Sequence, residues 1–285
     1  MKRVIALMVL AAALLTLCAC GKSKAVKQTD QLISAIGTVS IQSADAIEAA
    51  ERALAALTDE EQKTVKNGEV LREARQAYEK LPEKLAFDLS KQAYEKVSEA
   101  YDIIELLGED IYEAWRLGVY ESKDVLKKGT ELLAKETHLS QEEVADGAIY
   151  TMMSSLASEP FHMDNLDEAS LQALRETIDA SFLLFSGDLL TFCVGAVRDA
   201  YRVNGSLDTV DMALEEAKSC MKELSEKYAD YEYYPSLKEF YTTANAFYDY
   251  CKIPTGSFQQ AIDTINDYKN DARKFRNDLD YIFKD

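Results

Sequence analysis

The sequence predicts an all-α protein: an antiparallel up-and-down bundle of long amphipathic helices, preceded by a small helical module. Apolar residues recur along most of the chain at intervals near 3.6, the period of an α-helix, and no stretch forms a convincing strand pattern. Only 4 prolines and 11 glycines interrupt 285 residues, which leaves room for long helices. With 47% hydrophobic and 29% charged residues, the composition is that of a globular protein.

The charge balance restricts the partners. The formal net charge is −18 at pH 7. Nucleic acids and anionic membrane surfaces are bound through Lys and Arg that neutralise phosphate, so an acidic chain is a poor partner for either. We therefore expect no nucleic-acid partner and no membrane contact through the surface of the helical body.

Residues 1–19 have the pattern of a signal peptide. Lys2 and Arg3 form a short positive segment, and the run 4–19 is apolar. A helix that crosses a bilayer needs about 20 apolar residues, so this run is too short for a comfortable span. A positive start followed by a short apolar run and a small residue is typical of a secretory signal peptide.

The end of that run, Leu17-Cys18-Ala19-Cys20, resembles the lipobox of bacterial lipoproteins. The resemblance implies that the Cys20 thiol carries diacylglycerol and that cleavage falls just before Cys20. The mature chain would then start at Cys20 and be lipid-anchored on the extracytoplasmic face of the cell membrane, where two buried acyl chains hold a protein stably. An ordinary secretory signal and an uncleaved anchor are the alternatives.

Three further cysteines, Cys193, Cys220 and Cys251, would remain after this processing. They contain no Cys-x-x-Cys pair, which argues against a zinc knuckle or a thioredoxin-like site. Each falls on an apolar helical stripe, where a free cysteine packs as a small hydrophobe. Buried core thiols are the first interpretation, and one disulfide among the three is the second.

Residues 20–81 are expected to form a tether and a small helical module. The pattern predicts a helix over 25–36 that stops at Gly37, and a second helix after Ser43. Thr58 opens a capping box for a short helix that Asn67-Gly68 ends, and a fourth element covers 71–81.

Four runs stand out in the segment 33–81: Ile36-Gly37-Thr38-Val39, Ala46-Ile47-Glu48-Ala49-Ala50, Leu57-Thr58-Asp59-Glu60-Glu61-Gln62-Lys63 and Val65-Lys66-Asn67. With these runs the segment resembles a small helical module found in surface-exposed proteins of Gram-positive gut bacteria. The resemblance implies a cell-surface location and no catalytic residues.

Residues 82–285 are expected to form the bundle. Proline suits the first turn of a helix, so Pro82 is expected to open the longest apolar pattern, which extends to Thr137 as one helix or two. Ser140 begins a capping box for the next helix, and 159–165, which contains Pro160, is expected to be a loop.

A long helix is then expected over 167–203, ended by Asn204-Gly205 in a left-handed cap. Gly187, Thr191 and Gly195 would form a ridge of small residues on it, suited to close approach of a neighbouring helix or, alternatively, to a hinge or ligand cleft. Further helices are expected to begin at Ser206, at Pro235 and after the turn Pro254-Thr255-Gly256-Ser257. Because the loops are short, neighbouring helices should be antiparallel.

The sequence shows no catalytic, cofactor or metal constellation. Only Glu159-Pro160-Phe161-His162 has the Glu-x-x-His spacing of a di-iron helix, and its proline places it in a loop. Glu136 and His138 are two residues apart, which should put them on different helix faces. No nucleophile elbow, P-loop or dinucleotide fingerprint is present. We therefore expect no cofactor, no metal and no enzymatic activity.

Tyrosines are concentrated between 228 and 250. Tyr231, Tyr233 and Tyr234 lie in the segment before Pro235, where the apolar pattern does not require burial. Exposed aromatic rings stack on sugars or anchor a protein partner, so these three are the candidate partner-binding residues. The alternative is a loop that packs over the end of the bundle.

Together these patterns predict a membrane-anchored extracytoplasmic lipoprotein that acts as a non-enzymatic interaction or spacer module. Its partner would be a protein or a cell-wall polymer. The alternative is a ligand-binding lipoprotein that serves a transporter or sensor, although such proteins are usually α/β. The oligomeric state does not follow from the pattern.

Overall fold

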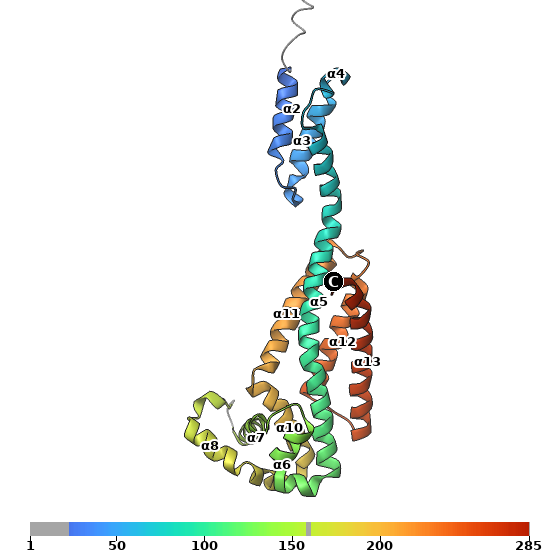
Figure 1. The fold of residues 1–285 in the computed structure, drawn as a ribbon. Coiled ribbons are helices and arrows are strands. Elements are labelled where there is room, and N and C mark those ends of the chain that lie inside the picture. The colour runs from blue at the N-terminus through green and yellow to red at the C-terminus, as the bar shows by residue number, and fades with distance from the viewer. Residues whose placement is uncertain (1–22, 158–160, 285) are drawn as a thin grey trace, which may run out of the picture. The chain divides into compact units, whose positions relative to one another are not determined.

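The computed structural model describes residues 23–157 and 161–284. Over these residues the chain forms helices, turns and bends and no strand, so the predicted all-α helical bundle is confirmed (Figure 1). The chain divides into two compact units, Met1–Leu85 and Ala86–Asp285. The signal peptide and Cys20 lie outside the described residues.

The first unit consists of short helices packed on a small apolar core. Ile33, Ile47 and Leu71 are buried in that core. Polar contacts also join its segments: Asp30, for example, accepts hydrogen bonds from the backbone N–H groups of Lys66 and Asn67 at 2.8 and 3.1 Å. The helices are α2 (Lys24–Ala35), η1 (Ile41–Ser43), α3 (Ala44–Ala55), α4 (Asp59–Gln62) and the first part of α5 (Gly68–Tyr120).

Local sequence signals end and begin these helices as expected. Gly37, just after α2, has φ 61°, a left-handed conformation that glycine adopts without steric cost. Thr58 caps α4 through its hydroxyl, and the Glu61 carboxylate accepts the Thr58 N–H in return. The capping box that the sequence predicts at Thr58 is therefore confirmed.

Helix α5 begins earlier than the sequence suggests. It runs from Gly68 to Tyr120 with Pro82 inside it, so the prediction that Pro82 opens the helix is wrong. Proline removes one helical hydrogen bond, here to the carbonyl of Tyr78. Pro82 is exposed, so water can solvate the freed carbonyl, and the helix continues.

Residues 82–137 form two helices rather than one. Helix α5 ends at Tyr120, and α6 (Ser122–Glu136) follows after Glu121. Helix α6 is itself kinked at Lys128, which has φ −148° and ψ 49°. After the kink, the Asp179 carboxylate accepts the Thr130 N–H at 3.0 Å and caps the remaining part of α6.

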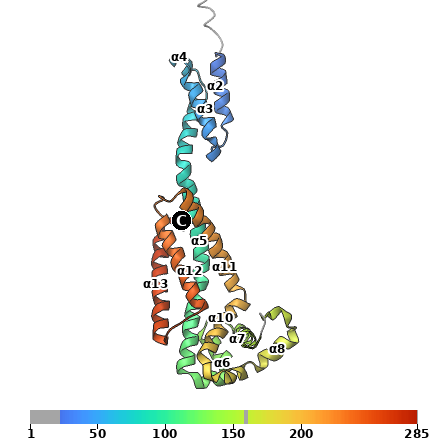
Figure 2. The ribbon, with the colours of Figure 1, turned by 180° about the vertical axis from the view of Figure 1, so that it is seen from behind.

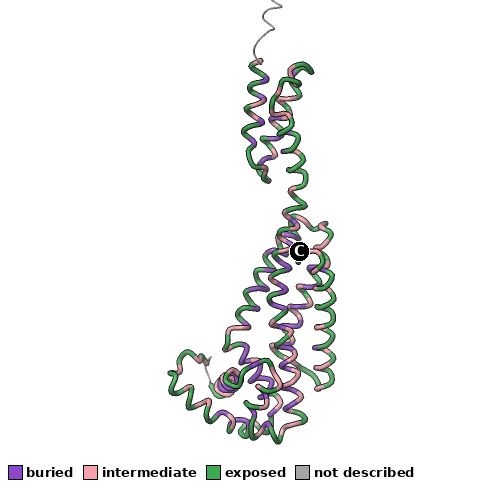
Figure 3. Tube along the Cα trace, in the orientation of Figure 1, coloured by how far each residue is buried: buried purple, intermediate pink, exposed green. Residues whose placement is uncertain are grey.

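The second unit combines long helices that lie alongside one another with a group of shorter ones. In both views the part of α5 within this unit lies beside α11, α12 and α13, while α6 to α10 gather around its C-terminal end (Figures 1 and 2). Helix α7 is seen end-on and therefore crosses the long helices. Buried positions recur along the long helices α5, α11, α12 and α13 (Figure 3). The remaining elements are α7 (Gln141–Leu156), η2 (Met163–Asn165), α8 (Glu168–Thr177), α9 (Asp179–Leu184), η3 (Ser186–Asp188), α10 (Leu189–Val203), α11 (Ser206–Lys227), α12 (Tyr234–Lys252) and α13 (Phe258–Phe283).

The single helix predicted over 167–203 is wrong, because this segment forms α8, α9, η3 and α10. The breaks bring the Phe185 and Phe192 rings into a stack with centroids 4.5 Å apart. In a continuous helix, residues seven apart would be separated by about 10.5 Å along the axis. Aromatic packing therefore favours the broken chain over a straight helix.

The predicted ridge of small residues is also wrong for two of its three members. Gly187 and Thr191 are exposed, and only Gly195 contacts a neighbouring helix, through the Thr151 side chain. The closest helix approach lies instead at Gly147 of α7. A Cβ atom at Gly147 would stand 2.0 Å from the Ala196 carbonyl oxygen of α10. Only glycine leaves room for backbone contact this close.

Helices α5 and α13 are antiparallel and are joined by a series of ion pairs. Asp102 pairs with Arg276 at 2.5 Å and Glu105 pairs with Arg273 at 2.6 Å. From Asp102 to Glu105 the pairs advance three residues along α5, while from Arg276 to Arg273 they go back three residues along α13. The Tyr94 hydroxyl also donates to Asp280 of α13, so polar contacts fix the register of this pair.

Predicted cap positions in this unit are mostly confirmed. Ser140 forms the predicted capping box, and Gly205 has φ 82° as expected for a left-handed cap. Ser257, predicted only as the end of a turn, also forms a capping box. Pro235 lies in the first turn of α12. Ser206 does not cap α11, because it is already the first helical residue after Gly205.

The glycine contacts predict the effect of two substitutions. Gly147→Ala should lower the free energy of unfolding by about 3 kcal/mol, because the added methyl group overlaps the α10 backbone. Urea unfolding monitored by circular dichroism measures this. Gly187→Ala is the matched control, because a Cβ added there meets no atom within 4 Å. Equal stability of the two variants would contradict the close α7–α10 approach.

Candidate functional site

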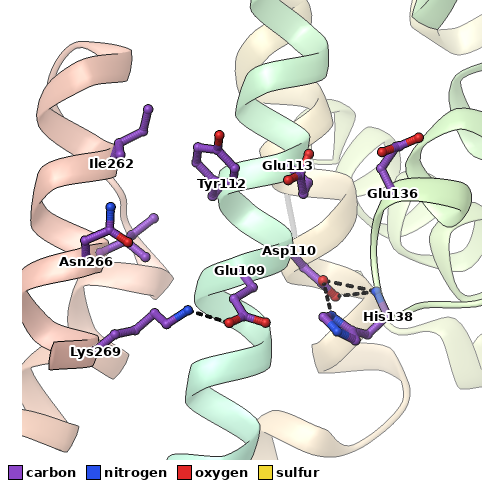
Figure 4. A pocket seen from close by; sticks show the side chains of 10 residues that line it. Glu109, Asp110, Tyr112, Glu113, Glu136, His138, Ile262, Asn266 and Lys269 are labelled. Atoms are coloured by element: carbon purple, nitrogen blue, oxygen red, sulfur yellow. Dashed lines mark hydrogen bonds and ion pairs between the residues drawn. The ribbon is translucent and has the colours of Figure 1, made fainter. Parts of the chain in front are cut away.

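A cavity of about 450 Å³ lies between α5, the end of α6 and α13 in the second unit. Its walls combine charged, aromatic and aliphatic side chains. Figure 4 shows α5 between α13 on one side and the α6–α7 connection on the other. Its lining residues are Glu109, Asp110, Tyr112, Glu113, Glu136, His138, Ile262, Ile265, Asn266 and Lys269.

Asp110 is the buried carboxylate of this site, with 1% of its surface exposed. It accepts hydrogen bonds from the His138 backbone N–H at 3.0 Å and from the Tyr201 hydroxyl at 2.8 Å. Its Oδ1 lies 2.7 Å from His138 Nδ1. Burial raises the pKa of Asp110 above its ordinary value, while these hydrogen bonds lower it in part.

His138 is oriented by this carboxylate. An ionised Asp110 accepts a hydrogen bond from Nδ1–H of His138, and in the neutral ring with that tautomer Nε2 carries the lone pair. No hydrogen bond to Nε2 is made by any described residue, and 52% of the side chain is exposed. In this tautomer His138 contributes a hydrogen-bond acceptor to the cavity wall.

The other charged groups of the wall are held in ion pairs. Glu109 pairs with Lys269 across the cavity, as the dashed line in Figure 4 shows. Arg116, beside the cavity, reaches Glu113 at 2.6 Å and Glu136 at 3.4 Å. The Lys135 ammonium beside Glu136 lowers the pKa of that carboxyl, which keeps it ionised near neutral pH.

One side of the cavity is apolar. Ile262 and Ile265 of α13 supply aliphatic surface. The Tyr112 ring stacks on Phe258 with centroids 5.9 Å apart, which fixes its position in the wall. The arrangement combines an oriented acceptor, several carboxylates and an apolar face, as in sites for small ligands.

Glu136 and His138, which the sequence predicts to point in different directions, both line this cavity. His138 follows the end of α6, so helical spacing no longer governs its direction. Glu159 and Pro160 of the Glu-x-x-His motif lie outside the described residues. Within the two described stretches, no three His, Cys, Asp or Glu side chains are grouped so as to hold a metal ion.

Asp110 is not among the candidate residues predicted from the sequence, although the sequence contains a signal for it. Leu107 and Ile111 are fully buried, and Asp110 lies three residues after the first of them on the same side of α5. An acid on an apolar stripe requires buried partners, and this marks it as unusual. The identity of those partners does not follow from spacing, because His138 and Tyr201 are distant in sequence.

The candidate partner-binding tyrosines lie at the start of α12. Tyr231, Tyr233 and Tyr234 are partly buried and pack against the core. The Tyr231 and Tyr233 rings meet edge to face at 5.5 Å, and Tyr233 also contacts Phe283 of α13. Part of each tyrosine stays accessible, so partner binding at this segment stays a prediction.

The three cysteines of the body are free and buried. Burial raises the pKa of the Cys193 thiol to about 12 and also raises the pKa of Cys251. A thiolate is therefore scarce at either position near neutral pH. Core thiols, rather than a disulfide, are what the structure shows.

No protein-family model, no curated protein and no solved structure matches this chain. Among the helices of the described residues, none has the combination of length and apolar character that crossing a bilayer requires.

The raised pKa of Asp110 predicts a pH-dependent difference in stability. The folded state binds this proton more tightly than the unfolded state, so the contribution of Asp110 is fully present below its ordinary pKa and is lost as pH rises through the raised value. Relative to Asp110→Asn, the wild-type chain should lose free energy of unfolding as the pH is raised from about 4, the ordinary pKa of an aspartate, toward neutral pH.

Urea unfolding across that pH range measures the difference. Asp271→Asn, at an exposed position of α13, shows the effect of removing one surface charge. A wild-type advantage over Asp110→Asn that grows with pH would contradict the prediction.

Proposed function

We propose that this chain is a membrane-anchored lipoprotein of the extracytoplasmic face whose helical units act as a non-enzymatic interaction or spacer module. The observation that carries the proposal is the sequence Leu17-Cys18-Ala19-Cys20 at the end of a short apolar run. It is followed at once by polar Gly21-Lys22-Ser23-Lys24, which suits a tether next to a membrane.

The partner is proposed to be a protein or a cell-wall polymer that contacts the segment 231–234. Three tyrosines gather there, and packing on the core holds their rings in place. Rigid, partly exposed aromatic rings lose little conformational entropy on binding, which favours them as anchors.

Ligand binding on behalf of a transporter or sensor is the second function that an observation favours. The cavity of about 450 Å³ beside Asp110 and His138 is large enough for a small molecule. Its oriented histidine and its apolar face give such a molecule both polar and apolar contacts.

Lipidation at Cys20 predicts a change in partitioning. Wild-type protein expressed in a lipoprotein-processing bacterium should enter the detergent phase of a detergent-partition assay, because two acyl chains bind it to micelles. Cys20→Ala should move to the aqueous phase. Retention of Cys20→Ala in the detergent phase would mean that the apolar run itself is the anchor.

Counting thiols in denaturant gives an independent readout of the same processing. The precursor has 5 cysteines, and the body holds Cys193, Cys220 and Cys251 as free thiols. Loss of Cys18 with the signal peptide and acylation of Cys20 leave only those three to react with a thiol reagent in guanidinium. Cys18→Ser is the matched control, because it should leave the count of the mature protein unchanged. Five reactive thiols would contradict both cleavage and acylation.

If the segment 231–234 binds the partner, removing one of its tyrosine rings should reduce the amount of partner crosslinked to the protein. Tyr234→Ala should reduce the amount of material crosslinked to the protein on intact cells by about tenfold, the effect of removing a central aromatic anchor. Tyr281→Ala, at a tyrosine that is 88% exposed and outside the segment, should leave recovery unchanged. Equal recovery from the two variants would argue that the segment only packs over the bundle.

A further inference from the structure

The cavity beside His138 has one feature that selects among small molecules: four of its lining side chains are carboxylates, those of Glu109, Asp110, Glu113 and Glu136. Ionised carboxylates only accept hydrogen bonds, and Nε2 of a neutral His138 whose ring proton is directed to Asp110 is a further acceptor. The donors in the wall are Tyr112, Asn266 and Lys269, and Lys269 is already paired with Glu109.

The charge of the wall points the same way. The Arg116 guanidinium beside the cavity faces three carboxylates, those of Glu113, Glu121 and Glu136. Lys135 adds a second cation, paired with Glu136 at 2.7 Å. Even without Asp110, the four carboxylates of Glu109, Glu113, Glu121 and Glu136 outnumber the three cations Arg116, Lys135 and Lys269. A cation that enters gains from this field, and an anion is repelled.

The position of the acceptors is fixed before any ligand arrives. Asp110 holds the imidazole of His138, and the Tyr201 hydroxyl holds Asp110 in turn. An acceptor that is oriented in advance costs less entropy on binding than a free side chain. The Ile262 and Ile265 side chains lie across the cavity and supply an apolar surface for a carbon skeleton.

We propose that this cavity binds a small organic amine. Its ammonium group donates hydrogen bonds to Nε2 of His138 and to the carboxylates of Glu113 and Glu136, and its carbon skeleton packs on Ile262, Ile265 and Tyr112. This inference rests on the ligand-binding function proposed above and is independent of the lipid anchor.

The first test uses nuclear magnetic resonance of the two histidines. The sequence has only His138 and His162, so the ring resonances are assigned by one substitution, and exposed His162 is an internal control. The full-length chain, purified in detergent, is titrated at pH 7.5 with 2-phenylethylamine. Similar-sized neutral and anionic probes, 2-phenylethanol and 3-phenylpropionate, are titrated in parallel.

The amine should shift the His138 resonances and leave those of His162 unchanged, with a Kd of about 1 mM or tighter. The alcohol should bind at least about tenfold more weakly and the carboxylate more weakly still, because they lack the ammonium donor and the anion is repelled. Equal shifts from the amine and the carboxylate would overturn the amine assignment while leaving a ligand site in place. Equal shifts of His138 and His162 with the amine would show surface binding and overturn the proposal.

Variants test the same assignment without disturbing the buried Asp110. The double variant Glu113→Gln/Glu136→Gln should weaken amine binding by about tenfold, and Glu131→Gln, which removes an exposed acid from α6, should not. Asn266→Trp, at an exposed position in the wall, should block the cavity and abolish binding. Unchanged amine binding by Asn266→Trp and by the double variant would overturn the proposal.

These experiments test amine binding in the cavity independently of lipidation at Cys20. Cys20→Ala should bind 2-phenylethylamine as the wild-type chain does, whether or not the partition assay shows lipidation. If no probe shifts His138 at about 10 mM, the amine inference and the ligand-binding function both fail, while the lipoprotein proposal still stands on its own assay.

Discussion

The carboxylate of Asp110 brings together three segments of the second unit. Asp110 lies on α5. Its carboxylate contacts the backbone and ring nitrogens of His138, in the α6–α7 connection, and accepts a hydrogen bond from the Tyr201 hydroxyl of α10. A carboxylate with 1% exposure is costly to bury, and the cost falls only when partners satisfy its oxygens. The chain after α6 must therefore turn so that residue 138 meets α5. That turn also carries Glu136 and His138 to the cavity wall, so the shape of the cavity depends on the same buried group.

Much of the helical pattern is predictable from local sequence, because helix ends are decided by a few neighbouring residues. The capping boxes at Thr58, Ser140 and Ser257 are each contained within four residues. Gly205 takes the left-handed conformation that its position after a helix requires. Local chemistry fixes such features before any tertiary contact forms.

The errors arise where tertiary contacts override local signals. The position of Pro82 predicts a helix start. The preceding residues already belong to helix α5, however, and the exposed proline does not end that helix. The segment 167–203 has a continuous apolar pattern, but the contacts between Phe182, Phe185 and Phe192 favour a broken chain. The candidate cavity was not predictable for a related reason. Asp110 and Tyr201 are 91 residues apart, and periodicity says nothing about which helices become neighbours.

The burial of every cysteine in the described residues has a practical consequence for experiments on this protein. Cys193, Cys220 and Cys251 are free, enclosed by apolar side chains and poorly ionised. A cysteine introduced at a surface position of the body would thus be the one thiol there that reacts readily in the folded state. A fluorophore or spin label can be attached at a chosen point on α8 or α13 without first replacing the native cysteines, and the fold needs no oxidant to form.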